Sequence, residues 1–199
     1  MTKIISLVNQ KGGVGKTTTS INLAASLGKL GKKTLIIDLD PQGNTTTGLG
    51  VNKGEIKASI YDVLNGDSPI KKAIKKTSFD LLSIIPATIN LAGIDYELLE
   101  KGHNDSEFKK NEQLRNALSE VKDNYDYIII DCPPSLGVLT TNALVASDSV
   151  IIPVQCEFFA LEGISQLLNT IIMTQTRLNP NLKIEGVLLT LLDSRTNLG

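Results

Sequence analysis

KGGVGKTT, Lys11 to Thr18, is the stretch that decides the fold, because an apolar run precedes it and a helical pattern follows it. The apolar run, Lys3 to Val8, has the length of a buried strand. Beyond the glycines, apolar residues recur at helical spacing and predict one buried helix face: Ile21, Ala24, Leu27 and Leu30. The order strand, glycine-rich loop, helix is the context that a phosphate-binding loop requires, so an ordinary glycine turn is the weaker interpretation.

The glycines of this loop predict a site for a polyphosphate. Gly12, Gly13 and Gly15 allow backbone N–H groups to turn inward as an anion nest, and the helix N-terminus adds partial positive charge. Lys16 is placed to reach the β- and γ-phosphates, and the Thr17 hydroxyl is placed to ligate Mg²⁺. The predicted nucleotide-binding residues are Lys11, Gly12, Gly13, Val14, Gly15, Lys16, Thr17 and Thr18.

The loop departs from the standard GxxxxGK[ST] pattern at two positions. Gln10 stands where that pattern has glycine, and the chain carries an additional lysine, Lys11. A second cation in the loop is costly unless it neutralises phosphate charge. Because the first lysine of such a loop can point away from its own nucleotide, Lys11 is a candidate to serve a neighbouring subunit.

Apolar runs and helical patterns alternate along most of the chain. Further runs of buried-strand length are Thr34–Leu39, Phe79–Pro86, Tyr127–Asp131, Ser149–Val154 and Ile184–Thr190. Helical patterns cover Asn111–Val121, Gly137–Ala146 and Phe158–Thr176, the last with an apolar face of Leu161, Ile164, Leu168 and Ile171 that suits core packing better than membrane attachment. The alternation predicts an α/β sandwich of three layers, with a mainly parallel twisted sheet and helices on both faces, and the glycine loop makes this a P-loop NTPase fold.

The bulk composition narrows the class of protein. With 199 residues, 41% apolar and 21% charged, the chain has the composition of one soluble globular domain, and disordered or fibrous classes are excluded. The net charge of −1 means that any DNA binding must come from a local patch or from dimerisation. Cys132, Cys156 and one His103 are too few for a zinc site, and no apolar run reaches the roughly 18 residues of a membrane span.

Two carboxylate motifs follow predicted strands. In DLDPQGN, Asp38 to Asn44, strand alternation puts Asp38 and Asp40 on the same side, so either can approach a magnesium ion or an attacking water. The alternative is a turn opened by Asp-Pro, within a glycine-rich mobile loop over residues 38–55. In IIIDCPPS, Asp131 ends a strand in the manner of a Walker B acid, behind the magnesium ion. The predicted metal-site residues are Thr17, Asp40 and Asp131.

Several other residues are expected to have structural or solvent-exposed roles rather than chemical ones. Cys132 is expected to be a small packed residue, and His103 a surface residue. Without a Ser-His-Asp set, hydrolysis is expected to use positioned water rather than a covalent intermediate. Four lysines of KKAIKK suit a solvated helix face better than contacts with nucleic-acid phosphates: Lys71, Lys72, Lys75 and Lys76.

KGGVGKTT, DLDPQGN, IIIDCPPS and PVQCE, in this order, resemble the ParA/Soj-type partition ATPases, whose relatives include MinD. The resemblance covers nearly the whole chain. It implies that Lys11 crosses an ATP-sandwich dimer, that Lys16 and Thr17 bind phosphate and Mg²⁺, and that Asp40 orients the hydrolytic water. It makes Asp131 the Walker B acid and Lys11, Lys16 and Asp40 the catalytic residues.

The same resemblance implies the biology of the protein. It implies slow ATP hydrolysis stimulated by a ParB-type partner, an ATP-dependent homodimer that binds DNA without sequence preference, and a cytoplasmic, nucleoid-associated location. Arg195 falls where family members carry a basic residue associated with DNA. Since family members usually continue further, residues 1–199 are expected to be a single P-loop ATPase domain that is incomplete at its C-terminus.

Three alternatives remain at this stage. A MinD-like membrane-cycling ATPase needs a basic amphipathic terminal helix, which the chain does not show. A nucleotide-binding scaffold without turnover tolerates loss of Asp40, which is present here. An iron–sulfur reductase needs more cysteines than the chain has near a dimer face. The residues do not distinguish ATP from GTP, so ATP is taken from the resemblance.

Overall fold

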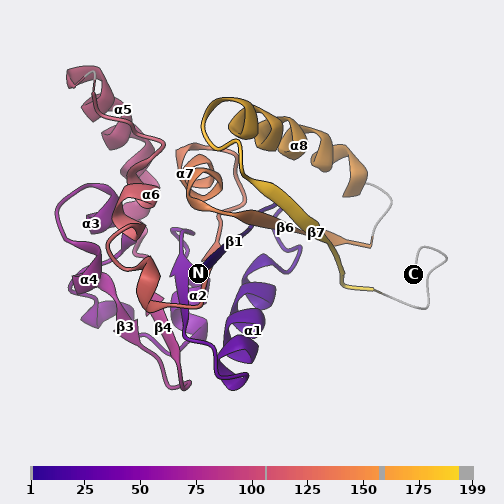
Figure 1. The fold of residues 1–199 in the computed structure, drawn as a ribbon, viewed down its shortest axis with the longest axis horizontal. Helices are drawn as coiled ribbons and strands as arrows, with labels where there is room; N and C mark the ends of the chain where they lie inside the picture. Colours follow the sequence, from indigo (N-terminus) through magenta and orange to yellow (C-terminus); the bar gives the residue numbers. More distant parts are fainter. Residues whose placement is uncertain (1, 106, 157–159, 193–199) are drawn as a thin grey trace.

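The structure, a computed structural model, describes residues 2–105, 107–156 and 160–192, and the side chains of 160–163 are not described. Within these ranges, seven strands form one sheet in the order β3-β4-β2-β5-β1-β6-β7 (Figure 1). Neighbouring strands are parallel except at the β3–β4 edge, where they are antiparallel. The predicted α/β class with a mainly parallel sheet is confirmed.

Each predicted strand is present, with small changes in its ends. The strands are β1 Lys3–Leu7, β2 Thr34–Asp38, β3 Lys75–Lys76, β4 Leu82–Ile85, β5 Tyr127–Asp131, β6 Ser149–Gln155 and β7 Lys183–Thr190. The run predicted from Phe79 starts three residues later, because Leu81 has a φ of +59° and belongs to a turn. The short edge strand β3 was not predicted.

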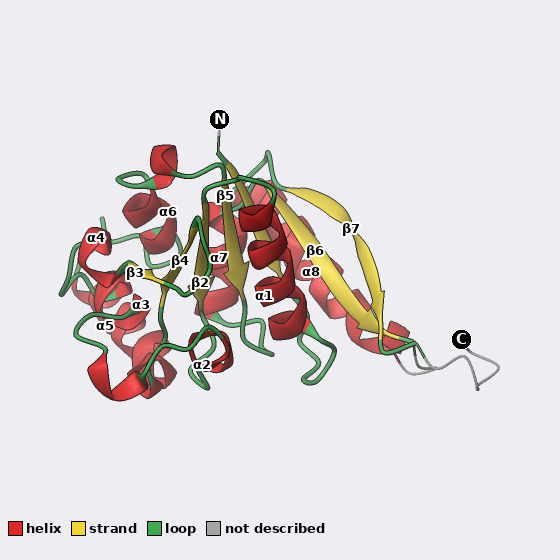
Figure 2. Ribbon diagram, turned by 90° about the horizontal axis from the view of Figure 1, so that it is seen from below, coloured by secondary structure: helices red, strands yellow, loops and turns green. Residues whose placement is uncertain are grey.

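Helices cover both faces of the sheet. They are α1 Lys16–Lys29, α2 Asn44–Gly48, α3 Ile60–Leu64, α4 Ile70–Ala73, α5 Ile94–Asn104, α6 Gln113–Leu118, α7 Val138–Ala146 and α8 Ala160–Arg177, with short 3-10 turns η1 Lys53–Glu55, η2 Ile89–Gly93 and η3 Lys122–Asn124. Figure 2 shows α1 on one face and α7 and α8 on the other. The three layers expected from the sequence are therefore present.

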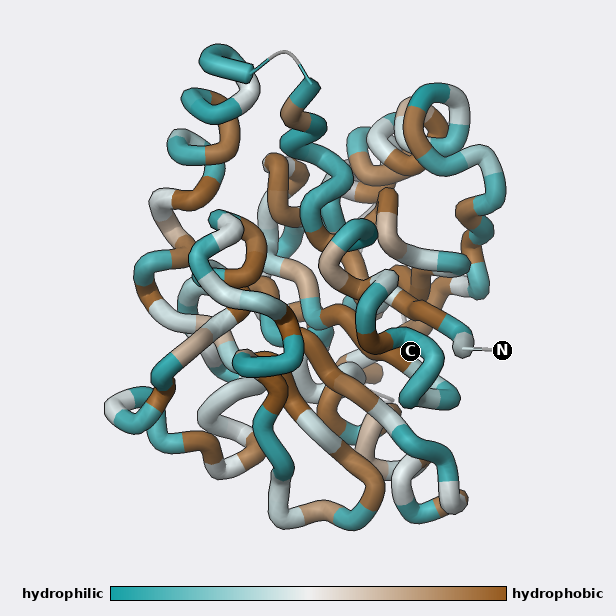
Figure 3. The backbone as a smooth tube through the Cα atoms, turned by 60° about the vertical axis from the view of Figure 1, so that its left-hand side comes forward, coloured by the Kyte–Doolittle hydropathy of each residue, from teal (hydrophilic) through white to brown (hydrophobic). Residues whose placement is uncertain are grey.

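The core is divided by the sheet. On β5, Ile128 and Ile130 pack with the helices α3 and α5 to α8, whereas Ile129 packs with α1. This alternation explains why the central strands are apolar along their whole length, since both faces are covered. Figure 3 shows hydrophobic residues gathered along these strands in the middle of the molecule.

Two expectations about local structure were wrong. Leu30 was placed on the buried face of α1, but the helix ends at Lys29 and Leu30 is 75% exposed. Residues 38–55 were expected to form one mobile loop, but they contain α2 and η1. The α2 sequence NTTTG has weak helix propensity, so the helix depends on the tertiary hydrogen bonds described below.

No helix in the described part of the chain has the length and apolar character that crossing a bilayer would require.

Gly28 marks a close approach between α1 and the turn before β4. A Cβ at this position would lie 2.8 Å from the Asp80 carbonyl oxygen. We expect Gly28→Ala to lower the free energy of unfolding by about 1 kcal/mol, because overpacking outweighs the gain in helix propensity. Urea unfolding measures this, with Ser26→Ala on the exposed face of α1 as the control. Equal stability of the two variants would show that the turn yields freely.

Candidate functional site

The predicted site residues meet at the carboxyl ends of β1, β2 and β5, where parallel sheets of this kind bind ligands. The strand register places Asp131 beside Leu7 of β1 and beside Asp38 of β2. The phosphate loop leaves β1 at this level and leads into α1. Motifs that are far apart in the sequence are thereby brought to one edge of the sheet.

The phosphate loop has the backbone conformation that its glycines predict. Gly13 and Gly15 have φ values of +75° and +85°, a region that costs other residues about 1–2 kcal/mol. Gly15 is the N-cap of α1, so the helix begins at Lys16. A Cβ built on Gly12 or Gly13 would meet nothing within 4 Å, so the space beside the loop is open. An anion can therefore approach the helix N-terminus.

Lys16 lies inside the loop rather than on its surface. Its side chain is 7% exposed, and Nζ donates to the Lys11 carbonyl oxygen at 2.9 Å. Burial lowers the pKa of Lys16, and the nearby charges of Asp131 and Asp40 partly oppose that shift. The ammonium group is thus placed where a phosphate would favour its charged form.

Asp131 is the meeting point of three hydroxyl groups. Its Oδ2 accepts hydrogen bonds from Thr17 Oγ1 at 2.8 Å and Thr45 Oγ1 at 2.6 Å, and its Oδ1 accepts one from Ser20 Oγ at 3.0 Å. Burial raises the pKa of Asp131, and these hydrogen bonds oppose that shift. The carboxylate therefore holds α1 and α2 against the end of β5.

Two of these hydroxyls were missed by the sequence analysis. Ser20 stands three residues after Thr17, so helical spacing already placed both on one face of α1. Thr45 carries no such signal, since its contact with Asp131 depends on where α2 lies.

Asp38 and Asp40 have different environments. Asp38 is fully buried, and its Oδ2 accepts from the Thr46 backbone N–H and from Thr46 Oγ1, both at 2.7 Å. Burial raises the pKa of Asp38 to about 6. Asp40 is half-buried, and its Oδ1 accepts from the Gln42 N–H at 2.9 Å. Asp38 thus anchors α2, and Asp40 makes the turn contact that the alternative interpretation predicted.

The residues present fit a magnesium ion that is held together with a nucleotide. In the described ranges, no cluster of three or more His, Cys, Asp or Glu side chains is placed to hold a metal on its own. Mg²⁺ in nucleotide sites takes few protein ligands, with phosphate oxygens and water as the others. The Thr17 hydroxyl, backed by Asp131, is the kind of ligand that such a site needs.

Other residues singled out in the sequence lie away from this edge. Cys132 is buried and burial raises its pKa, which confirms the packed interpretation. The KKAIKK lysines are divided between α4 and β3 rather than forming one helix face, because the helix ends at Ala73. Arg195 lies outside the described residues.

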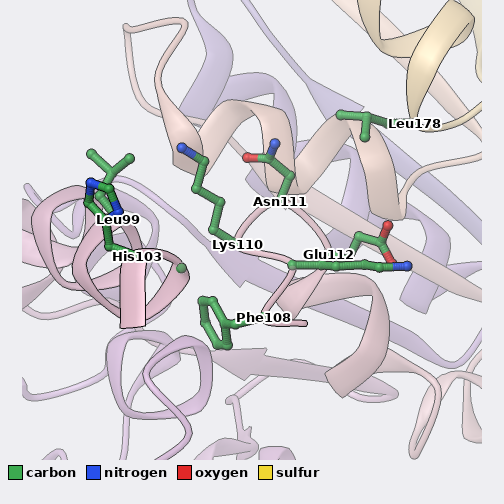
Figure 4. Close-up of a pocket in the computed structure, with 9 residues that line it drawn as sticks. Leu99, His103, Phe108, Lys110, Asn111, Glu112 and Leu178 are labelled. Atoms are coloured by element: carbon green, nitrogen blue, oxygen red, sulfur yellow. The ribbon is translucent and has the colours of Figure 1, made fainter. Parts of the chain in front are cut away.

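A separate cleft of about 520 Å³ lies between α5 and the segment before α6 (Figure 4). Leu99, Phe108 and Leu178 form part of its wall, and the exposed His103 lies at its edge, as a surface residue should. None of the residues that line it is a predicted site residue or one of the hydrogen-bond partners described above, so the cleft is treated as separate from the site.

Comparisons with known proteins agree with this geometry. A family model described as an AAA domain matches residues 2–184. The chain is 58% identical to the sporulation initiation inhibitor protein Soj of Bacillus subtilis (strain 168), over 100% of this chain and 76% of that protein. It is 53% identical to the chromosome partitioning protein ParA of Myxococcus xanthus (strain DK1622), over 98% of this chain and 67% of that protein.

A solved structure extends the comparison to three dimensions. The crystal structure of a cobyrinic acid a,c-diamide synthase from Mycobacterium smegmatis, with bound ADP and magnesium, is similar with a TM-score of 0.91 and 43% identity. The match covers 98% of this chain and 77% of that one. The fold around the phosphate loop is therefore shared with a protein that holds a nucleotide and magnesium.

Removing one hydroxyl tests the role of Asp131 as an anchor. Thr45→Val removes the 2.6 Å hydrogen bond to a buried carboxylate and is expected to lower the free energy of unfolding by about 1.5–3 kcal/mol. Thr47→Val on the same helix is the control, because Thr47 is an exposed residue whose hydroxyl donates to the Gly43 carbonyl oxygen of its own helical turn. Equal losses in urea unfolding would show that α2 is held by other contacts.

Proposed function

This chain belongs to the ParA/Soj-type partition ATPases of the AAA-domain family, and we propose that it is an ATP-dependent dimerising switch that segregates a plasmid or chromosome. The observation that carries the proposal is the glycine loop with Lys16 inside it and Thr17 bonded to Asp131. That arrangement suits a Mg-nucleotide, because it places a lysine, a helix N-terminus and a hydroxyl ligand around one glycine loop.

ATP with Mg²⁺ is the proposed ligand. Lys16 neutralises charge on the β- and γ-phosphates, and the loop N–H groups bind the phosphate oxygens. Thr17 provides a hydroxyl ligand, and Asp131 holds that hydroxyl in place. A bound magnesium ion would supply positive charge that offsets the negative charge developing on the departing ADP. The nucleotide and magnesium in the M. smegmatis neighbour support this assignment.

Hydrolysis is proposed to be slow and Mg-dependent, with Asp40 orienting the attacking water. Asp40 is only half-buried, unlike Asp38, and its Oδ1 bond to Gln42 fixes the carboxylate within the turn after β2. A ParB-type partner is proposed to stimulate this step.

Lys11 is the proposed link between two protomers. Its side chain is exposed on the phosphate loop, whereas Lys16 is buried within it. The two lysines are therefore suited to different phosphates, one in the same protomer and one across an ATP-sandwich homodimer. The dimer is proposed to bind DNA without sequence preference and to associate with the nucleoid in the cytoplasm.

Two other functions share the same loop. A MinD-like membrane-cycling ATPase and a scaffold without turnover both keep Lys16 and Thr17. The first predicts retention on anionic vesicles, and the second predicts no phosphate release.

The chain is more identical in sequence to Soj and ParA than to the diamide synthase, which favours the partition function over that synthase activity.

Solution mass in three nucleotide states tests the switch. We expect a dimer with Mg-ATP and a monomer with ADP or without nucleotide. Lys11→Ala should stay monomeric because the cross-subunit cation is lost. Asp40→Ala should stay dimeric for longer and hydrolyse ATP about 100-fold more slowly, because the water loses its orienting group.

The matched control is Lys29→Ala, which removes an exposed lysine at the far end of α1. It should behave as the wild type does. A mass that is indifferent to nucleotide contradicts the proposed switch, and equal turnover by Asp40→Ala and wild type contradicts the role of Asp40.

DNA retention is expected only with Mg-ATP and should weaken as salt rises. Each phosphate contact contributes a slope of about −0.9 to the dependence of log affinity on log salt. Arg195→Ala should therefore make the salt dependence less steep without changing the dimer mass. Arg177→Ala, at the exposed end of α8, is the control and should leave the salt dependence unchanged. An unchanged salt dependence in Arg195→Ala would contradict the assignment of Arg195 to the DNA-binding surface. The KKAIKK lysines would then be the next residues to test.

A further inference from the structure

The phosphate loop is held from the side of β7 by one hydroxyl group. The hydroxyl of Thr190, the last residue of β7, shares its one proton between the Val14 carbonyl oxygen at 2.8 Å and the Val154 carbonyl oxygen at 3.2 Å. Its Cγ2 methyl lies 3.6 Å from the point that a Cβ on Gly15 would occupy. A single side chain therefore contacts the loop, β6 and β7.

The carbonyl that Thr190 holds controls the direction of an N–H group. The Val14 C=O and the Gly15 N–H belong to one peptide plane, and in a trans peptide they point in opposite directions. A hydroxyl that draws the carbonyl toward β7 turns the Gly15 N–H away from β7. Because Gly15 has a φ of +85° and no side chain of its own, contacts from outside the loop must fix this plane.

The beginning of the loop is fastened to β6 by a different residue, Asn9. Asn9 is 5% exposed, and its Nδ2 donates to the Pro153 carbonyl oxygen at 2.7 Å. Its Oδ1 accepts from the Lys11 N–H at 2.9 Å. Asn9 and Thr190 thus fasten the two ends of the loop to successive carbonyls of β6, at Pro153 and Val154.

We propose that Thr190 is a positioning residue for phosphate binding: its hydroxyl holds the Val14 carbonyl and so aims the Gly15 N–H at the phosphates. The proposal rests on the proposed nucleotide function. Through this hydrogen bond, nucleotide affinity depends on the position of the end of β7, a strand at the edge of the sheet. Nothing in the sequence around Thr190 predicts this, because the residue is only the last of an apolar run.

Binding of Mg-ATP and Mg-ADP to Thr190→Val, Thr190→Ser and wild type tests the proposal. Valine keeps the shape of threonine and the methyl contact with Gly15, so only the hydroxyl is lost. Thr190→Val should bind both nucleotides about three- to tenfold more weakly, because a peptide plane loses a net hydrogen bond. Thr190→Ser keeps the donor and should bind within about twofold of the wild type.

Thr174→Val is the control for a purely structural effect. Thr174 is 3% exposed, and its hydroxyl, like that of Thr190, donates to a backbone carbonyl, here that of Thr170 on α8. Both valine variants should lower the urea midpoint without nucleotide, but only Thr190→Val should weaken nucleotide binding. Lys16→Ala serves as the variant that cannot bind.

The outcomes separate this proposal from the proposed function. Wild type that binds no better than Lys16→Ala contradicts the nucleotide function itself. Wild-type affinity in Thr190→Val, or a folded Thr190→Ser that binds as weakly as Thr190→Val, overturns the positioning role while leaving the nucleotide function in place. Recovery of affinity in Thr190→Ser alone supports it.

Discussion

The buried carboxylate of Asp131 is the constraint on which the rest of the site depends. A carboxylate that is 1% exposed is costly unless donors surround it, and three hydroxyls do so here. Two of them come from α1 and one from α2. The sheet therefore orients both helices through one side chain, and the beginning of α1 is where the phosphate loop ends.

A second buried acid extends this arrangement to the next strand. Asp38 holds the backbone and side chain of Thr46, and Thr46 Oγ1 in turn accepts from the Ala87 N–H at 3.0 Å. The three residues connect β2, α2 and the segment after β4. These bonds explain how the short helix α2, which contains three threonines, is stabilised. Asp40 is only half-buried and is therefore the more exposed carboxylate of the two.

The phosphate loop shows why positive charge and backbone geometry have to be fixed together. Burial lowers the pKa of Lys16, which disfavours its charged form. Gly13 and Gly15 adopt positive φ values and lack side chains, so the loop has conformational freedom that a binding site has to restrict. Asn9 and Thr190 restrict it from β6 and β7. The lysine is thus supported by the loop carbonyl of Lys11, and the loop is supported by the sheet.

The sequence by itself determined the α/β class, six of the strands and the place of the phosphate loop, because buried strands are apolar runs and the loop needs glycines at fixed spacing. It also singled out Thr17 and Asp131 as candidates through motif spacing, and the structure joins the two by a hydrogen bond. It did not determine α2, the division of labour between Asp38 and Asp40, or the parts played by Thr45 and Thr190. Those depend on hydrogen bonds between residues more than 80 positions apart in the case of Thr45, and 176 apart for Thr190. Only the tertiary structure decides such pairs, because a hydroxyl has the same local pattern whether its partner is water or a buried acceptor.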